Sequence, residues 1–222
     1  MEEQLSKIRS TFHQYFEDED KKSAVMYCLD LLKNQEVDIL DLYSGVLTKE
    51  LNEMTCKLDN HHICIWQEHV KTAIVRTIVE CAYPYVEAKK EELNYPERGK
   101  AVVLCPPEEY HDLGARMVAD YLTVLGFETI FVGSNTPYQD FLNAVDVIKP
   151  ELIAISVSNY YNLVVTKKVI AEIKGKLKSE CQILVGGNAF HGSSDICKTI
   201  GADCCCATME DIKKWVLKGG EA

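Results

Sequence analysis

The sequence lacks a long hydrophobic run, since no stretch reaches the roughly 18 uncharged apolar residues that a membrane-spanning helix needs. It also lacks a basic amino terminus: it begins Met-Glu-Glu-Gln-Leu, where a secretory signal peptide would carry positive charge. No cluster of basic residues offsets the formal net charge of -10, so general attraction to nucleic acid or anionic lipid is not expected. These absences predict a cytoplasmic protein that binds neither nucleic acid nor membrane directly.

The 10 cysteines lack the C-x-x-C spacing that lets two thiolates converge on one zinc ion. Most of them fall in apolar runs, where cysteine acts as a small hydrophobic residue, and in this setting we expect reduced thiols rather than a disulfide framework. Cys204, Cys205 and Cys206 are adjacent. We expect them to form the last strand of a sheet, with a metal site as the less favoured alternative.

Residues 1–90 show the apolar spacing of helices throughout. Apolar side chains recur at three and four residues in four successive segments, which predicts a four-helix bundle. The third helix is expected to run to about Leu58 and the fourth to end near Lys89, with Pro84 kinking it or ending it early. Residues 91–99 are charged and contain Pro96 and Gly99, so we expect them to form a linker between two domains.

From residue 100 to 222 short apolar runs alternate with helical patterns, which predicts a five-stranded, parallel, doubly wound Rossmann-like (flavodoxin-like) domain. The expected strands are 101–105, 128–132, 151–156, 181–185 and 203–206. The expected helices are 112–125, 136–148, 160–178, 191–200 and 208–218. The fold class is therefore α/β, with the helical bundle in front.

A polar motif follows the first of these strands. The strand at 101–105 is stopped by Pro106-Pro107, and a helical pattern begins at Leu113, so Glu109 and His111 lie in a strand-to-helix loop. In an open parallel sheet ligands bind beyond the carboxyl ends of the strands. A carboxylate at 109 could accept an imidazole N–H and make the other ring nitrogen a better metal ligand. The alternative is a solvated loop histidine beside a solvated acid.

Two later strand ends are expected at the same edge of the sheet. One carries the hydroxyls of Ser156 and Ser158, and the other carries Gly186-Gly187, where side chains are missing and a ligand could approach closely. A tight turn explains the glycine pair equally well.

Taken together, Glu109-x-His111-x-x-Gly114, Ser156-Val157-Ser158 and Val185-Gly186-Gly187 resemble the cobalamin-binding domain of the methionine synthase type. The helical half resembles the matching cap domain, above all in Glu68-His69-Val70-x-Thr72-Ala73-x-Val75-Arg76. The likeness covers about residues 20 to 216. It also extends to the corrinoid proteins of methyltransferase systems and to light-sensing cobalamin-dependent regulators.

The resemblance implies that cobalamin binds base-off, with its dimethylbenzimidazole tail in the α/β domain and His111 as the lower axial ligand of cobalt. Glu109 would be the hydrogen-bond partner of His111, and Ser156 would join the tail pocket or the hydrogen-bond relay. Further residues are assigned to the cofactor site by the same likeness: Asp112 and Gly114 in the first loop, Ser158, Gly186 and Gly187 along the nucleotide tunnel, and Glu68, His69 and Leu58 toward the upper face.

Two positions depart from the family pattern. The usual aspartate two residues before the histidine is Glu109 here, as in the light-sensing repressors. The usual tryptophan ten residues before the Glu-His pair is Leu58, and Trp66 is too close to that pair to replace it. The upper ligand, methyl or adenosyl, therefore stays open. His61 and His62 are expected in a polar turn, with an upper-ligand role as the less favoured alternative.

Three functions are compatible with these residues. The first is a corrinoid methyl carrier for partner methyltransferases, since the chain lacks a catalytic barrel of about 250 residues and would be a non-catalytic subunit rather than a complete enzyme. The second is an adenosyl- or methylcobalamin-dependent sensor that acts through a regulatory protein partner. The third is a domain that binds haem or no cofactor. We favour the carrier, with partners docking around the first two strand-end loops and the turn before the fourth helix.

Overall fold

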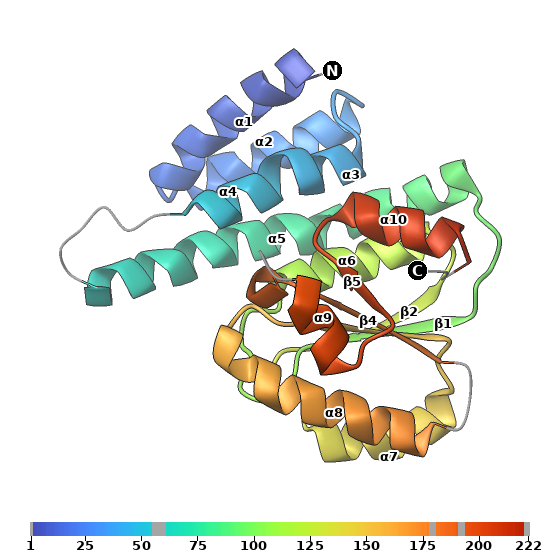
Figure 1. Ribbon diagram of the computed structural model, residues 1–222. Helices are drawn as coiled ribbons and strands as arrows, with labels where there is room; N and C mark the ends of the chain where they lie inside the picture. The colour runs from blue at the N-terminus through green and yellow to red at the C-terminus, as the bar shows by residue number, and fades with distance from the viewer. Residues whose placement is uncertain (1, 55–60, 178–180, 191–193, 220–222) are drawn as a thin grey trace. The chain divides into compact units, whose positions relative to one another are not determined.

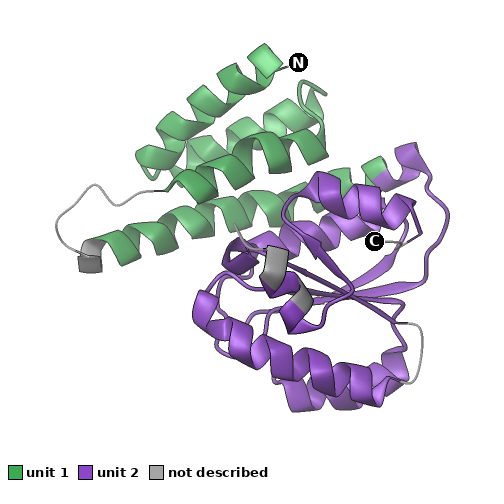
Figure 2. Cartoon of the chain, in the orientation of Figure 1, with its two compact units in different colours: residues 1–89 green, residues 90–222 purple. Residues whose placement is uncertain are grey.

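A computed structural model describes residues 2–54, 61–177, 181–190 and 194–219. The chain divides into two compact units, residues 1–89 and 90–222 (Figure 2).

The first unit is helical. It contains α1 (Glu2–Glu17), α2 (Lys21–Lys33), a continuous run of α3 (Ile39–Asp41), the π-helical segment η1 (Leu42–Leu47) and α4 (Thr48–Glu53), and most of α5 (His61–Leu93). Its core is formed by fully buried side chains such as Phe12, Phe16 and Tyr43. These four helical stretches agree with the four predicted from apolar spacing.

Two helix ends differ from the prediction. The third stretch ends at Glu53 rather than near Leu58, because Met54 already has an extended ψ of 117°. Leu58 itself lies outside the described residues. Helix α5 runs through Pro84 and continues to Leu93, beyond the expected end near Lys89. The residues that follow Lys89 favour helix strongly, so α5 extends into the first part of the charged segment.

The second unit is a five-stranded parallel sheet in the order β2-β1-β3-β4-β5. The strands are β1 (Lys100–Leu104), β2 (Glu128–Gly133), β3 (Leu152–Ser156), β4 (Gln182–Gly186) and β5 (Cys204–Cys206). The helices between and after them are α6 (Leu113–Val124), α7 (Tyr138–Ile148), α8 (Leu163–Lys176), α9 (Ser194–Ile200) and α10 (Met209–Leu217). Two short 3-10 turns, η2 (Tyr160–Asn162) and η3 (Asn188–Phe190), follow β3 and β4. The predicted α/β fold class is confirmed.

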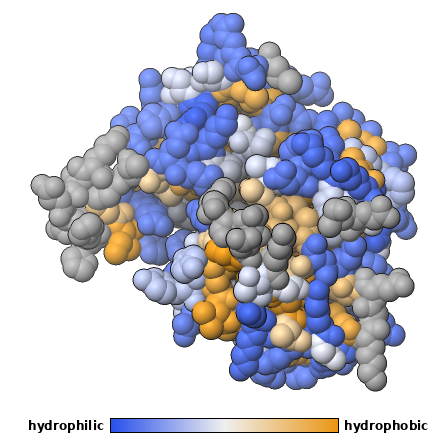
Figure 3. Space-filling model, in the orientation of Figure 1, coloured by the Kyte–Doolittle hydropathy of each residue, from blue (hydrophilic) through white to orange (hydrophobic). Residues whose placement is uncertain are grey.

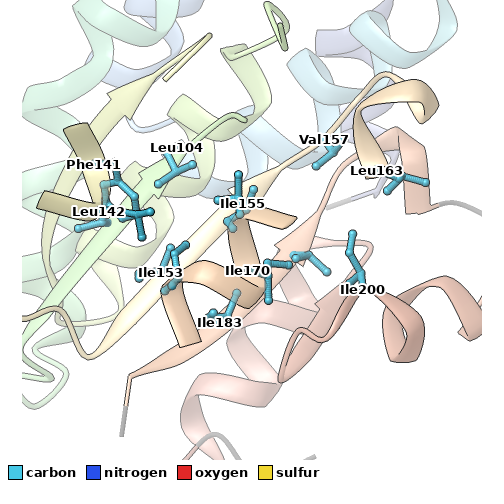
Figure 4. Close-up of a cluster of buried hydrophobic side chains, with 14 of the residues drawn as sticks. Leu104, Phe141, Leu142, Ile153, Ile155, Val157, Leu163, Ile170, Ile183 and Ile200 are labelled. Atoms are coloured by element: carbon cyan, nitrogen blue, oxygen red, sulfur yellow. The ribbon is translucent and has the colours of Figure 1, made fainter. Parts of the chain in front are cut away.

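Helices cover both faces of this sheet (Figure 1). On one face, α7, α8 and α9 pack on the central strands around a buried aliphatic cluster (Figure 4) that includes Ile153, Ile155, Ile170 and Ile183. Helix α6 contacts β1, β2 and β3, and α10 contacts β5. The strands are apolar on both sides because both sides are covered.

The cysteines differ in part from the expectation of reduced thiols. Cys197 of α9 and Cys205 of β5 form a disulfide with Cα atoms 5.8 Å apart, and Cys64 is disulfide-bonded as well. That expectation was therefore wrong for these three residues. For Cys197 and Cys205 the reason is that the fold brings α9 beside β5. The expectation that Cys204–Cys206 form the last strand is confirmed, and the Sγ atoms of Cys204 and Cys206 lie 3.5 Å apart on one face of it.

The free cysteines are expected to react at very different rates. Burial raises the pKa of Cys28 and of Cys105 to about 12, so both stay protonated near pH 8, whereas Cys81 is exposed. We expect iodoacetamide to modify Cys81 in the native protein and to modify Cys28 and Cys105 only after denaturation, as measured by peptide mass spectrometry. Equal labelling of the three in the native state would contradict this burial pattern.

Candidate functional site

The loop between β1 and α6 is fixed to the neighbouring loop after β2. The carbonyl oxygen of Glu109 accepts a hydrogen bond from Asn135 N–H at 2.8 Å, and Asn135 Oδ1 accepts one from Glu108 N–H at 2.9 Å. Asn135 and Glu108 both have positive φ, at 47° and 65°. These contacts set the path of the loop and carry Glu109 inward, at the edge of the sheet where all five parallel strands end.

The Glu109 side chain is fully buried and accepts five hydrogen bonds. Its Oε2 accepts from the backbone N–H groups of Ser158 at 2.9 Å and Asn159 at 2.8 Å, and from Asn162 Nδ2 at 3.1 Å. Its Oε1 contacts His111 Nδ1 at 2.7 Å and accepts from His111 N–H at 3.2 Å. One carboxylate thus joins the loop after β1 to the segment after β3.

This donor set keeps Glu109 ionised. Burial raises the pKa of Glu109, but the hydrogen bonds from Asn159, His111 and Asn162 outweigh burial and hold that pKa below its usual value. An ionised carboxylate can only accept hydrogen bonds, so His111 Nδ1 must carry the proton of their shared contact. The contact therefore fixes the proton on Nδ1 and leaves Nε2 as the ring nitrogen that can act as a ligand in a neutral imidazole.

His111 itself is turned toward the surface, with 59% of its side chain exposed. Nδ1 faces the buried carboxylate, and Nε2 lies on the other side of the ring. Three large side chains near this loop are also exposed, Tyr110, Tyr160 and Tyr161. The face of the molecule seen in Figure 3 is mostly hydrophilic and carries several hydrophobic patches. The arrangement offers an oriented nitrogen ligand at the functional edge of the sheet.

The other residues of this unit that were predicted for the cofactor site lie at the same edge of the sheet, and their surroundings differ. Asp112 is buried directly before α6 and makes no side-chain cap hydrogen bond. Gly114 is exposed, and an added Cβ would meet no heavy atom within 4 Å. Ser156 and Ser158 are half-buried, and Ser156 pairs with Gly186 across β3 and β4. The structure brings Ser158 onto Glu109 through its backbone N–H.

The glycine pair after β4 sits where other backbone approaches closely. A Cβ on Gly187, whose φ is 104°, would lie 2.4 Å from the carbonyl oxygen of Val157, and a Cβ on Gly186 would lie 2.7 Å from that of Cys206. The space above these glycines is thus filled by the chain that follows β3 and by β5. Both glycines are required by the packing of strand ends around the site.

Substitution of Gly187 by alanine is expected to destabilise the α/β unit by about 2 to 4 kcal/mol, because it combines a positive φ with a backbone clash. Gly114→Ala is the matched control and should stay within about 1 kcal/mol of the wild type. Urea denaturation followed by the fluorescence of the buried Trp215, in a Trp66→Phe background, measures this unit separately. Equal midpoints for the two variants would contradict the assignment.

Glu68 and His69 belong to α5 of the helical unit, where both are exposed. Leu58 and most of the turn before α5 lie outside the described residues, as do the side chains of His61 and His62. These predicted upper-face positions stay predictions.

Sequence reasoning missed Asn159 and Asn162. Both lie in a polar-aromatic segment that follows a strand, and nothing in their spacing from Glu109, 50 and 53 residues away, connects them to it. The sequence suggests only a local role for these two residues, because an asparagine next to the start of a helix usually caps that helix.

A family model and several known proteins match this chain. Residues 99–214 match the family model of the B12 binding domain, which is more than half of the chain. Over 168 residues the chain is 22% identical to trimethylamine corrinoid protein 1 of Methanosarcina acetivorans, covering 75% of this chain and 76% of that protein. It is 23% identical over 120 residues to the HTH-type transcriptional repressor CarA of Myxococcus xanthus, covering 54% of this chain and 38% of that protein.

Among solved structures, the monomethylamine corrinoid protein of Methanosarcina barkeri superimposes with a TM-score of 0.80 at 18% identity, covering 96% of this chain and 99% of that one. This likeness shows a shared fold. Within the described residues, none of the helices combines the length and apolar character that crossing a bilayer requires. The match over residues 99–214 identifies this chain as a member of the B12-binding domain family, with a cobalamin or related corrinoid as its cofactor.

Proposed function

We propose that this protein binds its corrinoid base-off, with His111 as the lower axial ligand, and carries a methyl group between partner methyltransferases. The observation that carries the proposal is the contact between His111 Nδ1 and the buried Glu109 carboxylate, 2.7 Å long, at the carboxyl edge of a B12-binding domain. The relationship to the trimethylamine corrinoid protein supports the carrier role.

The residues present fit a cobalt-centred cofactor. Imidazole nitrogen suits transition metals, and a carboxylate on the second ring nitrogen fixes the tautomer and raises the basicity of the ligating nitrogen. His111 is exposed enough to reach a ligand, while Glu109 is shielded from water. Gly114, three residues after His111, has open space around its Cβ position. When bound, the corrinoid supplies a cobalt centre that accepts and releases a methyl group.

The chain's own residues then do three things. His111 orients the cofactor through Nε2, Glu109 holds the imidazole, and the loop after β3 fixes the carboxylate. The exposed Tyr110, Tyr160 and Tyr161 lie within two residues of these groups along the chain, and a bound ring would bury part of their surface. We assign residues 1–90 to a cap unit, 91–99 to the connection and 100–222 to the cofactor-binding unit. Within the cap unit, Glu68 and His69 are our candidates for contacts with the upper face of the cofactor.

A cobalamin-dependent regulator is the second candidate. It is favoured by the glutamate at position 109, shared with the light-sensing repressors that this chain resembles, and by the similarity to CarA. Such a regulator would act through a protein partner, since the net charge of -10 opposes direct DNA binding.

One experiment separates the two candidates. The purified protein is mixed with hydroxo-, methyl- or adenosylcobalamin, and the visible spectrum and the elution volume in gel filtration are recorded before and after a minute of green light. A carrier is expected to bind methyl- and hydroxocobalamin without a light-dependent change in oligomer size. Preference for adenosylcobalamin together with such a change would favour the regulator, and no binding of any form would refute both.

A further inference from the structure

Asn162 supplies the side-chain hydrogen bond to Oε2 in the donor set around Glu109. Its Nδ2 lies 3.1 Å from Glu109 Oε2 and 3.4 Å from the carbonyl oxygen of Glu108. Both neighbours are acceptors, so the amide nitrogen of Asn162 must face them and its oxygen must point elsewhere. An amide N–H donates but does not accept, so Asn162 presents Glu109 with a donor under all conditions.

The position of Asn162 normally calls for a different contact. It is the residue directly before α8, where an asparagine side chain usually accepts a hydrogen bond from the first helical turn. The Asn162 side chain makes no such cap bond and is 6% exposed. Thr166 Oγ1 donates to the Asn162 carbonyl at 2.7 Å and fixes the residue to α8. The Asn162 side chain thus donates to Glu109 instead of capping α8.

The five hydrogen bonds to Glu109 are shared between the two oxygens of its carboxylate. Oε2 accepts hydrogen bonds from Ser158, Asn159 and Asn162, and Oε1 accepts the two from His111. Two of the three Oε2 donors belong to the backbone, so Asn162 is the member of this set that a side-chain substitution removes. Loss of a donor on Oε2 would let the carboxylate rotate away from the imidazole.

We infer that Asn162 is a positioning residue for cofactor binding, which holds Glu109 Oε1 on His111 and keeps the imidazole in its Nδ1–H tautomer before the cofactor arrives. This role rests on the proposed ligation of cobalt by His111. It differs from the expectation that Ser156 joins the relay, because the side chain that reaches Glu109 from the segment after β3 is that of Asn162.

The first test uses the protein without cofactor. Long-range proton–nitrogen NMR of histidine-labelled protein reports which ring nitrogen of His111 carries the proton. The wild type and Asn143→Ala, a control on α7, are expected to show the Nδ1–H form alone. Asn162→Ala should add the Nε2–H form, and Asn162→Asp should add more of it, since a second carboxylate would face Glu109. If Asn162→Asp does not fold, Asn162→Ala decides.

The second test measures the affinity for hydroxocobalamin in a double-mutant cycle with His111→Ala. Asn162→Ala alone should weaken binding about tenfold, the lower end of the effect of residues that orient a metal ligand. In the His111→Ala background it should have no further effect, because its influence passes through the imidazole. Equal losses in both backgrounds would mean that Asn162 acts only through the fold, and would overturn the inference.

The two tests distinguish a failure of the positioning role of Asn162 from a failure of the proposed ligation by His111. Wild-type tautomer and affinity in both Asn162 variants would refute the positioning role while leaving His111 as a ligand. A changed tautomer, with an affinity that neither Asn162→Ala nor His111→Ala alters, would support the positioning role and refute the proposed ligation.

Discussion

His111→Ala is expected to weaken corrinoid binding by at least about tenfold, or 1.4 kcal/mol, and to abolish the spectrum of nitrogen-ligated cobalt. The fold should survive, because 59% of the His111 side chain is exposed and substitutions at such positions usually change stability by about 0.5 kcal/mol or less. Visible titration with hydroxocobalamin measures the affinity, and a thermal melt followed by circular dichroism measures the stability.

The chain contains a matched control for this substitution. His13 of the helical unit is 51% exposed, and its Nδ1 lies 2.7 Å from Oε2 of Glu50, a carboxylate that is 3% exposed. The pair resembles His111 and Glu109 in geometry but lies in α1 and α4. His13→Ala should leave the cofactor spectrum unchanged. If the two alanine variants bound hydroxocobalamin equally well, His111 would not be the ligand.

Glu109→Gln is expected to weaken binding about as much as His111→Ala although the imidazole is retained. The glutamine oxygen should take the Oε2 side, where three donors converge, and its N–H2 group should then face His111 Nδ1. Nδ1 must accept this hydrogen bond, so the proton moves to Nε2, the nitrogen that the metal requires. Nitrogen NMR of the protein without cofactor should show the Nε2–H tautomer.

Glu50→Gln provides the control for this second substitution. It should change the tautomer of His13 in the same way and leave corrinoid affinity at the wild-type value. Retention of the Nδ1–H tautomer in Glu109→Gln, or wild-type affinity despite the changed tautomer, would contradict the role assigned to the carboxylate.

Much of the fold could be predicted from local patterns. The apolar runs at 101–105 and 151–156 and the switch to helical spacing at Leu113 place the strands to within about two residues, and they bring Glu109 and His111 to one loop. The pattern of parallel strands then predicts that Ser158 and Gly187 lie at the same edge. These features depend on nearest neighbours and on the topology of the sheet.

Most of the details that failed depend on tertiary contacts, and the end of α5 is the exception. Pro84 sits inside α5, which continues to Leu93 because the following residues favour helix. The use of Asn162 on Glu109 requires two loops 53 residues apart to meet, and the Cys197–Cys205 disulfide requires α9 to pack beside β5. In the sequence, an asparagine before a helix looks like a cap, and a glycine pair looks like a turn or an opening for a ligand. The close approach of the Val157 backbone to Gly187 is a further requirement that only the structure reveals.

The measurement that tests the central claim most directly is the electron paramagnetic resonance spectrum of the protein loaded with cobalamin in the cobalt(II) state, with its histidines labelled with nitrogen-15. If His111 is the lower axial ligand, the nitrogen splitting should change from the triplet of nitrogen-14 to the doublet of nitrogen-15, and His111→Ala should remove the doublet. An unchanged triplet would show that the benzimidazole of the cofactor remains on cobalt, and it would contradict base-off binding through His111.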